Sequence, residues 1–331
     1  MKLGLIAPHP QDSTSFYRSF GVLGPIERDT DISLLTGDKW SWDMLVRCDV
    51  LFMQRPWVEA HVQVAATAKQ MGIPLVLDYD DNLFALQRSN PAYSVFMNSQ
   101  AQQNMMKLAE LADVVTVTTP HLANLPPYKG KAIVVPNAMN DCYWEHSTVP
   151  RKNLISWRGG ISHYGDMDGH LSSIGRVADS HPDWKWLFIG DPHWGIEHAI
   201  PVSHRSNAPF TSIFNYMEGF AKAAPAIHIV PLANNAFNHS KSNLAWIEAT
   251  VAGAVVVAPD WMEWHRPGII NYGDGDFERV LTAAIAEKPE VRQQRVDLSR
   301  DYINKNLRLS GVNEQRIEIL RKLHNHEPLF A

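Results

Sequence analysis

Short apolar runs alternate with amphipathic segments along most of the chain. The apolar runs are rich in Val, Ile and Leu, which is typical of parallel strands that are buried on both faces. The segments between them repeat apolar residues at intervals of three and four, as the buried face of a helix does. The sequence therefore predicts an α/β fold in which helices cover both faces of parallel sheets.

The alternation forms two series, which a polar stretch at 142–152 separates. In the first series we expect strands at 2–7, 32–35, 49–56, 74–77, 114–119 and 132–135, and helices starting near Phe16 and Pro120 and covering 58–71 and 92–112. In the second we expect strands at 154–158, 184–190, 227–232 and 255–257, and helices at 166–180, 214–223, 241–252, 276–287, 289–307 and 312–324. This predicts an N-terminal domain at 1–148 and a C-terminal domain at 149–305.

The segment 238–259 combines a loop, a helix, a tight turn and a buried strand. Asn238 or Ser240 is suited to cap the helix, because their side chains accept hydrogen bonds from backbone N–H groups. Gly253 ends the helix and turns the chain directly into the strand. The rest of the chain is expected to be organised around this unit.

The start of this helix combines groups that suit a phosphate. A cap at 238–240 places Lys241 and Ser242 in the first turn, beside backbone N–H groups that have no partner within the helix. Glu248 lies two turns further on, where a carboxylate can accept paired hydrogen bonds from a sugar diol. On these residues alone, an ordinary amphipathic helix with Lys241 and Glu248 in solvent fits equally well.

The same stretch resembles the donor-nucleotide helix of retaining, two-domain (GT-B) glycosyltransferases, in particular glycosyltransferase family 4. The resemblance is carried by Ser240–Ser242, Trp246–Glu248 and Gly253–Val256. It implies two doubly wound, Rossmann-like domains that face a cleft, with a terminal helix in 306–331 crossing back to the first domain. It also implies that Glu248 binds the donor ribose and that basic side chains bind the diphosphate. Where the family often has a second Glu, which contacts the donor sugar, this chain has Ser240, which we therefore expect beside the donor sugar or base.

A polar loop at 8–15 follows the first predicted strand. It lacks the G-x-G-x-x-G fingerprint, which argues against a dinucleotide cofactor in the usual first turn. The segment Ser15–Arg18 resembles the part of the family's N-terminal domain that faces the cleft. This implies that Arg18 binds a phosphate or an acceptor oxygen, and an exposed Arg in a first helical turn is the alternative.

An acidic cluster, Asp78–Asn82, follows the strand at 74–77, so we expect it with Arg55 at the rim where ligands bind. Asp78-x-Asp80 is the kind of pair that holds Mg²⁺ or Mn²⁺ in the other major glycosyltransferase fold. The downstream phosphate-binding helix instead fits metal-independent enzymes, so we expect no metal. The resemblance places the cluster at the cleft, where Asp80 or Asp81 would orient or deprotonate an acceptor hydroxyl. Helix capping is the alternative.

A glycine pair follows the strand at 154–158. Gly159 and Gly160 allow the backbone to approach a ligand closely, and the helix that follows favours an anion at its N-terminus. We therefore expect a second half-site for the diphosphate, with Arg158 neutralising its charge. The loop also resembles a Gly-x-x-x-His loop of the family, which implies that His163 contacts phosphate or sugar, with a capping or solvent histidine as the alternative.

Two more segments resemble cleft-facing parts of the family. The rim after the strand at 184–190 contacts the nucleotide base in relatives, which implies that His193 and Trp194 are neighbours of the base; aromatic packing is the alternative. The segment at 135–138 resembles the end of the last N-domain strand, which implies that Asn137 faces the cleft and contacts the donor sugar or base.

Composition narrows the class of protein. At 331 residues, 45% of them hydrophobic and 20% charged, the chain has the mass of two folded domains. Its two cysteines, Cys48 and Cys142, are expected to be packing residues. With no leader or long apolar stretch, we expect no membrane span and a reduced, cytoplasmic compartment. The net charge of −5 gives no global attraction to nucleic acid.

We interpret the sequence as a retaining glycosyltransferase that needs no cofactor and takes its sugar from a nucleotide-diphosphate sugar, most readily a UDP-sugar. The acceptor is expected to carry a hydroxyl, as a surface glycan or a hydroxylated base in phage DNA does, since relatives occur in polysaccharide clusters and phage genomes. A nucleotide-sugar-binding module without turnover and a GT-B sugar-nucleotide epimerase are the alternatives.

Overall fold

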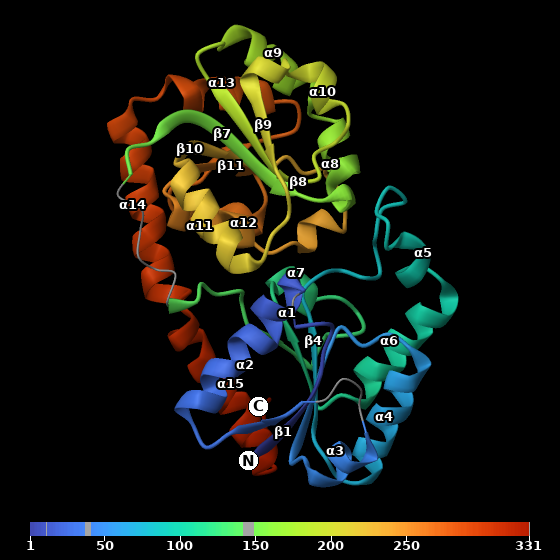
Figure 1. Ribbon diagram of the computed structural model, residues 1–331. Coiled ribbons are helices and arrows are strands. Elements are labelled where there is room, and N and C mark those ends of the chain that lie inside the picture. The colour runs from blue at the N-terminus through green and yellow to red at the C-terminus, as the bar shows by residue number, and fades with distance from the viewer. Residues whose placement is uncertain (11, 37–40, 142–148, 331) are drawn as a thin grey trace.

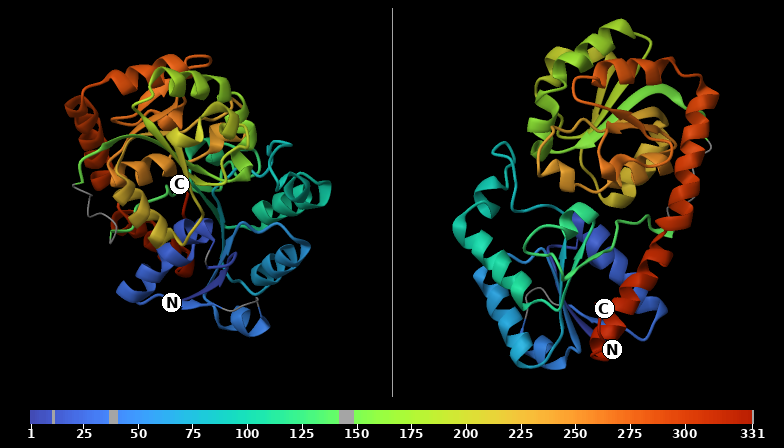
Figure 2. Two further views of the ribbon diagram at one scale, coloured as in Figure 1. Left: turned by 45° about the horizontal axis from the view of Figure 1, so that its top comes forward. Right: turned by 180° about the vertical axis from the view of Figure 1, so that it is seen from behind.

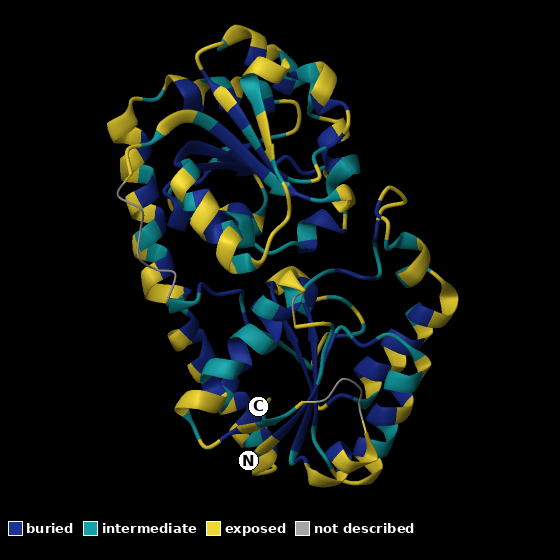
Figure 3. Ribbon diagram, in the orientation of Figure 1, coloured by how far each residue is buried: buried dark blue, intermediate teal, exposed yellow. Residues whose placement is uncertain are grey.

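The computed structural model describes residues 1–10, 12–36, 41–141 and 149–330. These residues form two α/β domains, one above the other in Figure 1, each built on a six-stranded sheet. The strands of both sheets form the buried centre of their domain, and exposed residues lie mainly on the helices (Figure 3). The prediction of two doubly wound parallel sheets is confirmed.

The first sheet has the strand order β2-β1-β3-β4-β5-β6. Its strands are β1 (Lys2–Ile6), β2 (Ser33–Leu35), β3 (Val50–Gln54), β4 (Leu75–Tyr79), β5 (Val114–Val117) and β6 (Ala132–Val134). Apolar side chains of α2 (Phe20–Asp29) pack on one face, and those of α3 (Trp42–Arg47), α4 (Glu59–Gln70) and α6 (Ser99–Leu111) pack on the other. Every residue of β3 and β4 is buried, because helices cover both faces.

The second sheet has the order β12-β11-β10-β7-β8-β9. Its strands are β7 (Lys152–Gly159), β8 (Lys185–Gly190), β9 (Arg205–Ala208), β10 (Pro225–Ile229), β11 (Val255–Pro259) and β12 (Ile270–Tyr272). One face is covered by α9 (Leu171–Ser180) and α13 (Phe277–Ala286), and the other by α11 (Ile213–Ala223) and α12 (Leu244–Ala252).

The last two helices connect the domains. As the red segment in Figure 2 shows, α14 (Pro289–Asn306) and α15 (Leu309–His324) run from the second domain down to the first. Apolar side chains of α15 join the core between β1, β3 and α2. At the crossing, the Met139 N–H donates to the Leu307 carbonyl at 3.0 Å, and the Leu309 N–H donates to the Met139 carbonyl at 2.8 Å. Residues 142–148 of the proposed boundary, including Cys142, lie outside the described residues.

Two predicted helices are each divided. The helix expected over 92–112 is α5 (Tyr93–Phe96) and α6, because the Asn98 side chain accepts a hydrogen bond from the Ala101 N–H at 2.9 Å and starts a new helix. The helix expected over 166–180 is α8 (Tyr164–Asp168) and α9, which are separated at Gly169 and His170. The edge strands β9 and β12 were missed, since short edge strands need no long apolar run.

No helix in the described part of the chain combines the length and the apolar character that crossing a bilayer requires. Cys48 is buried beneath β1, as a packing residue is.

Candidate active site

A cavity of about 880 Å³ lies between the two domains. The strand order reverses between β1 and β3 in the first sheet and between β7 and β10 in the second. Residues at or just beyond the carboxyl ends of all four strands line the cavity: Pro10, Arg55, Arg158 and Val230. Ligands of doubly wound sheets bind at such reversals, so the cavity is the candidate active site.

Glu248 is held at the wall of this cavity by three side chains. The Tyr17 hydroxyl donates to its Oε1 at 2.6 Å, and the Tyr216 hydroxyl donates to its Oε2 at 3.0 Å. The Nε atom of Arg158 lies 2.8 Å from the same Oε2. Tyr17 lies on α1 (Ser13–Arg18) of the first domain, whereas Tyr216, Arg158 and Glu248 belong to the second. The cluster therefore joins the domains.

Lys241 and Ser242 lie before α12 rather than in its first turn, which corrects the predicted start of the helix. Residues 238–240 form a short 3-10 turn. The Asn238 side chain does not cap α12, because its amide donates to the Ala233 carbonyl at 2.8 Å and to Asp166. The helix then starts at Leu244. The tight turn expected at Gly253 is confirmed, with a φ of 83°.

Hydrogen-bond donors without a protein partner remain at the start of α12. The N–H groups of Leu244 and Ala245 have no acceptor among the described residues, and both residues line the cavity. The Lys241 ammonium forms no ion pair within the described part of the chain and lies 4.6 Å from the centre of the Phe237 ring. Ser242 Oγ accepts a hydrogen bond from Asn137 at 2.9 Å. This corner of the cavity is suited to an anion.

The glycine loop contributes His163 to the cavity. Its Nδ1 lies 2.9 Å from Asp166 Oδ2, while Nε2 has no partner among the described residues. Burial and the nearby Lys241 lower the pKa of His163 despite the opposing effect of Asp166, so the imidazole is neutral at pH 7. Gly159 is explained by packing, because a Cβ there would lie 2.6 Å from the Trp157 ring. Neither Gly159 nor Gly160 lines the cavity.

The first domain contributes an acidic wall. Arg55 donates to both oxygens of Asp80 and to Asp81 Oδ2, the last at 2.8 Å. Arg55 has a φ of 47°, a left-handed conformation that is unusual for Arg, and its N–H donates to the Asp78 carbonyl at 2.9 Å. Burial opposes ionisation of Asp81, but Lys241 and Arg55 together hold its pKa below the usual value.

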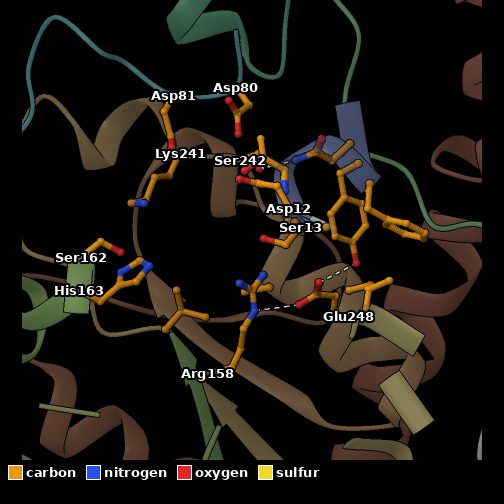
Figure 4. A pocket seen from close by; sticks show the side chains of 18 of the residues that line it. Asp12, Ser13, Asp80, Asp81, Arg158, Ser162, His163, Lys241, Ser242 and Glu248 are labelled. Atoms are coloured by element: carbon orange, nitrogen blue, oxygen red, sulfur yellow. Dashed lines mark hydrogen bonds and ion pairs between the residues drawn. The ribbon is translucent and has the colours of Figure 1, made fainter. Parts of the chain in front are cut away.

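Figure 4 shows how the charged side chains surround one opening. Arg158 and Glu248 lie on one side, and Asp80 and Asp81 lie on the opposite side. Lys241 and His163 complete the ring.

Arg18 reaches the cavity wall, but it is only 1% exposed and its donors are occupied. It donates to Asp78 at 2.7 and 3.0 Å, to the Val135 carbonyl at 2.8 Å and to Asn137 Oδ1 at 3.2 Å. We therefore assign Arg18 a positioning role, because it orients Asn137, which in turn binds Ser242. Asp78 also accepts from the Thr116 hydroxyl at 2.7 Å.

A metal between Asp78 and Asp80 would have to replace two arginines. Asp78 is paired with Arg18 and Asp80 with Arg55. Among the described residues, no group of three or more His, Cys, Asp or Glu side chains could hold a metal ion.

Three more of the expected donor contacts, Ser240, His193 and Trp194, lie outside the cavity. Ser240 is fully buried, and its Oγ donates to the Ala236 carbonyl at 3.2 Å. His193 is 4% exposed, with Nε2 2.9 Å from Asp168 and Nδ1 accepting from the Gly195 N–H at 2.9 Å. Trp194 is largely exposed and also lies away from the cavity.

Sequence reasoning missed several residues of the site. Tyr17, Tyr216 and Asp166 each bind a predicted site residue. Tyr17 lies in the segment that resembles a cleft-facing part of the family, which was a signal for it, whereas Tyr216 and Asp166 lie in ordinary amphipathic segments. Asp12 also lines the cavity, and its side chain caps α1 by accepting from the Thr14 N–H at 2.7 Å. Its position just after the first strand is the one signal that could have identified it.

A strap formed by residues 80–98 closes one side of the cavity. It leaves β4, rises toward α8 of the second domain and returns through α5 to α6 (Figure 1). Ser89 lies so close to Gly165 that a Cβ on the glycine would be 2.4 Å from the serine Oγ. Elsewhere the rings of Phe16 and Phe214, from different domains, pack edge to face with centroids 5.9 Å apart.

Comparison with known proteins gives a likeness in structure only. No protein-family model and no curated protein matches the sequence. A solved UDP-forming α,α-trehalose-phosphate synthase from Burkholderia xenovorans is 10% identical, with a TM-score of 0.63 over 97% of this chain and 99% of that one. A trehalose-6-phosphate structure from E. coli bound with UDP-2-fluoro glucose is 12% identical, with a TM-score of 0.57 over 96% and 84%.

A third similar structure is S. aureus TarM, in complex with Fondaparinux, α-GlcNAc-glycerol and UDP. It is 11% identical, with a TM-score of 0.59 over 84% of this chain and 56% of that one. At these identities the likeness concerns the fold. The chain has the two-domain GT-B architecture that the sequence predicted.

Proposed function

We propose that this chain is a glycosyltransferase that takes a sugar from a UDP-sugar and transfers it, with retention of anomeric configuration, to a hydroxyl group. One observation carries the proposal. Arg158, Lys241 and the Leu244 and Ala245 N–H groups, which have no acceptor in the described part of the chain, converge on the cavity that Glu248 also lines. A nucleoside diphosphate offers the complementary groups, two phosphates and a ribose diol. UDP and UDP-2-fluoro glucose in two proteins of similar fold support this choice of donor.

In this proposal the diphosphate lies between Lys241 and Arg158, close to the Leu244 and Ala245 N–H groups. These donors stabilise the negative charge that builds on the diphosphate as the sugar departs. The ribose hydroxyls donate hydrogen bonds to the Glu248 carboxylate, which requires them to replace at least one of the two tyrosine hydroxyls that donate to it now. Ser242 and Asn137 border the same phosphate site.

Retention follows if the acceptor hydroxyl attacks from the face that the diphosphate leaves. A phosphate oxygen then accepts the acceptor's proton, and no protein nucleophile is needed. Neutral His163, whose Nδ1–H donates to Asp166, presents Nε2 as a hydrogen-bond acceptor for a hydroxyl of the donor sugar. Asp80 and Asp81 lie opposite Arg158, where they would orient the acceptor hydroxyl.

Donor hydrolysis tests the proposal most directly. UDP-, GDP- and TDP-sugars are incubated with the protein and with Glu248→Gln, which keeps the size of the side chain but removes its charge. We expect hydrolysis of a UDP-sugar, and a loss of about 100-fold in kcat/KM in the variant, equivalent to about 2.7 kcal/mol. Glu218→Gln is the control, because Glu218 pairs with Lys222 on the exposed side of α11.

The other outcomes are equally informative. Nucleotide binding without any turnover would favour a binding module, and conversion of the donor to an isomeric sugar nucleotide would favour an epimerase. NMR of the first-formed product measures retention, and an inverted anomeric carbon would contradict that part of the proposal.

A further inference from the structure

The two halves of the cavity differ in charge. The second domain supplies two cations, Arg158 and Lys241, and one carboxylate, Glu248. The described side chains of the first domain that line the cavity include three carboxylates, Asp12, Asp80 and Asp81, and one guanidinium that faces them, Arg55, since Arg18 is paired with Asp78 behind the wall. Lys241 of the second domain also acts on Asp81, but in the proposed complex its charge is used by the donor diphosphate. The half that remains for an acceptor is therefore acidic.

This acidic half also has an apolar surface and a free donor. Leu83, Leu86 and Phe96 of the strap line it. Asn90 is 8% exposed and lines the same part, and its Oδ1 accepts from the Ala92 N–H at 2.9 Å. The Asn90 Nδ2 has no acceptor among the described residues, which leaves a hydrogen-bond donor for a ligand.

We propose that the acceptor is an uncharged sugar or polyol, and that the acidic wall rejects acceptors that carry a phosphate. The proposal rests on the glycosyltransferase function above and names its acceptor class. A sugar ring offers hydroxyls, which donate to the carboxylates and accept from Asn90, and apolar C–H faces, which pack on the leucines and Phe96. A phosphate on the acceptor would bring its negative charge close to the carboxylates of Asp12, Asp80 and Asp81 in a partly dehydrated cavity, where like charges repel strongly.

A substitution at Asp12 can remove one negative charge from the acidic half of the cavity without disturbing the helix that Asp12 caps. Its carboxylate caps α1, and Asn is an equally good capping residue, so Asp12→Asn removes the charge and keeps the cap. Asp12 contacts neither Glu248 nor Lys241 through any hydrogen bond or ion pair in the described part of the chain.

The test measures transfer from the UDP-sugar that the hydrolysis assay identifies. Acceptors are offered in matched pairs: glucose and glucose 6-phosphate, mannose and mannose 6-phosphate, glycerol and glycerol 3-phosphate. Hydroxymethylated DNA is offered beside them. We expect kcat/KM to be at least about tenfold higher for the uncharged member of a pair, corresponding to about 1.4 kcal/mol.

Asp12→Asn is expected to reduce this preference about two- to fivefold, the effect of one partly screened charge. The preference should also weaken as ionic strength rises, which a purely steric exclusion would not do. Glu218→Gln should leave the preference unchanged, because Glu218 lies away from the cavity.

Equal or better use of a phosphorylated sugar, or preferential transfer to hydroxymethylated DNA, would overturn the inference while the proposed function stands. So would donor hydrolysis without transfer to any uncharged sugar or polyol. Absence of both hydrolysis and transfer would overturn the inference together with the proposed function.

Discussion

The Tyr17 hydroxyl of the first domain donates a hydrogen bond of 2.6 Å to the Glu248 carboxylate of the second. Burial, followed by the charge of Glu248, raises the pKa of Tyr17 well above its usual value, so the phenol stays protonated and remains a donor at neutral pH. If Glu248 binds the donor ribose, Tyr17 occupies an oxygen that a ribose hydroxyl needs.

Tyr17→Phe is therefore expected to strengthen UDP binding. Removing the competing hydroxyl frees Oε1 for the ribose, and we expect a gain of about 1 kcal/mol, roughly fivefold in Kd. Isothermal titration calorimetry with UDP measures it. Tyr216→Phe is the matched comparison, because Tyr216 belongs to the same domain as Glu248 and donates to the other carboxylate oxygen, Oε2. Weaker binding by Tyr17→Phe would mean that the tyrosine orients Glu248 and is not displaced.

Lys241 is expected to bind phosphate specifically. Lys241→Met keeps an unbranched side chain over the Phe237 ring but removes the charge. We expect UDP affinity to fall about tenfold, about 1.4 kcal/mol, while uridine affinity is unchanged. Titration with both ligands measures the difference, and Lys222→Met, on the exposed side of α11, is the control. Parallel losses for UDP and uridine would argue against a phosphate contact.

The contact between Ser89 and Gly165 is expected to be needed for transfer. A side chain at Gly165 would displace the strap that carries Asp80, Asp81 and Asn90. We expect Gly165→Val to lower transfer at least about tenfold and Ser89→Gly to restore part of it in the double variant. Gly169→Val is the control, because a Cβ at Gly169 meets no atom within 4 Å. Equal activity of the two glycine variants would show that strap placement is unimportant.

His228 is expected to make stability depend on pH. Burial lowers the pKa of His228 to about 3, and its Nδ1 lies 3.0 Å from Ser156 Oγ. Its pKa is about 6.5 when unfolded, so the unfolded chain binds the proton first and stability is lost as pH falls below about 6.5. Protonation of His228 lowers the free energy of unfolding by at most about 1.4 kcal/mol per pH unit, down to about pH 3.

Urea unfolding at pH 7.5, 6.5 and 5.5 measures this dependence. His228→Asn does not titrate, so its free energy of unfolding should decline less steeply than that of the wild type below pH 6.5. Parallel curves would assign the pH dependence to other histidines, such as His163 and His170, whose pKa values are also lowered by burial.

The local pattern predicts the two sheets without the edge strands β9 and β12, together with the turn at Gly253, because buried parallel strands need continuous apolar runs and a helix must end before the next strand begins. It also brought Arg158, Lys241 and Glu248 together in one hypothesis, and the structure places all three at one cavity. Arg158 lies at a strand end and Lys241 just before a helix, positions that the local pattern marks, and Glu248 lies within that same helix.

Which of the marked residues face the cavity depends on how the chain packs in three dimensions. Arg18 and Asp78 neutralise each other inside the first domain, and Ser240 is turned into the core, although each lies in a segment that the pattern had singled out. Tyr17 meets Glu248 across 231 positions of sequence. Such pairings depend on how two separately formed sheets pack together, and the periodicity of a single element contains no information about its distant partners.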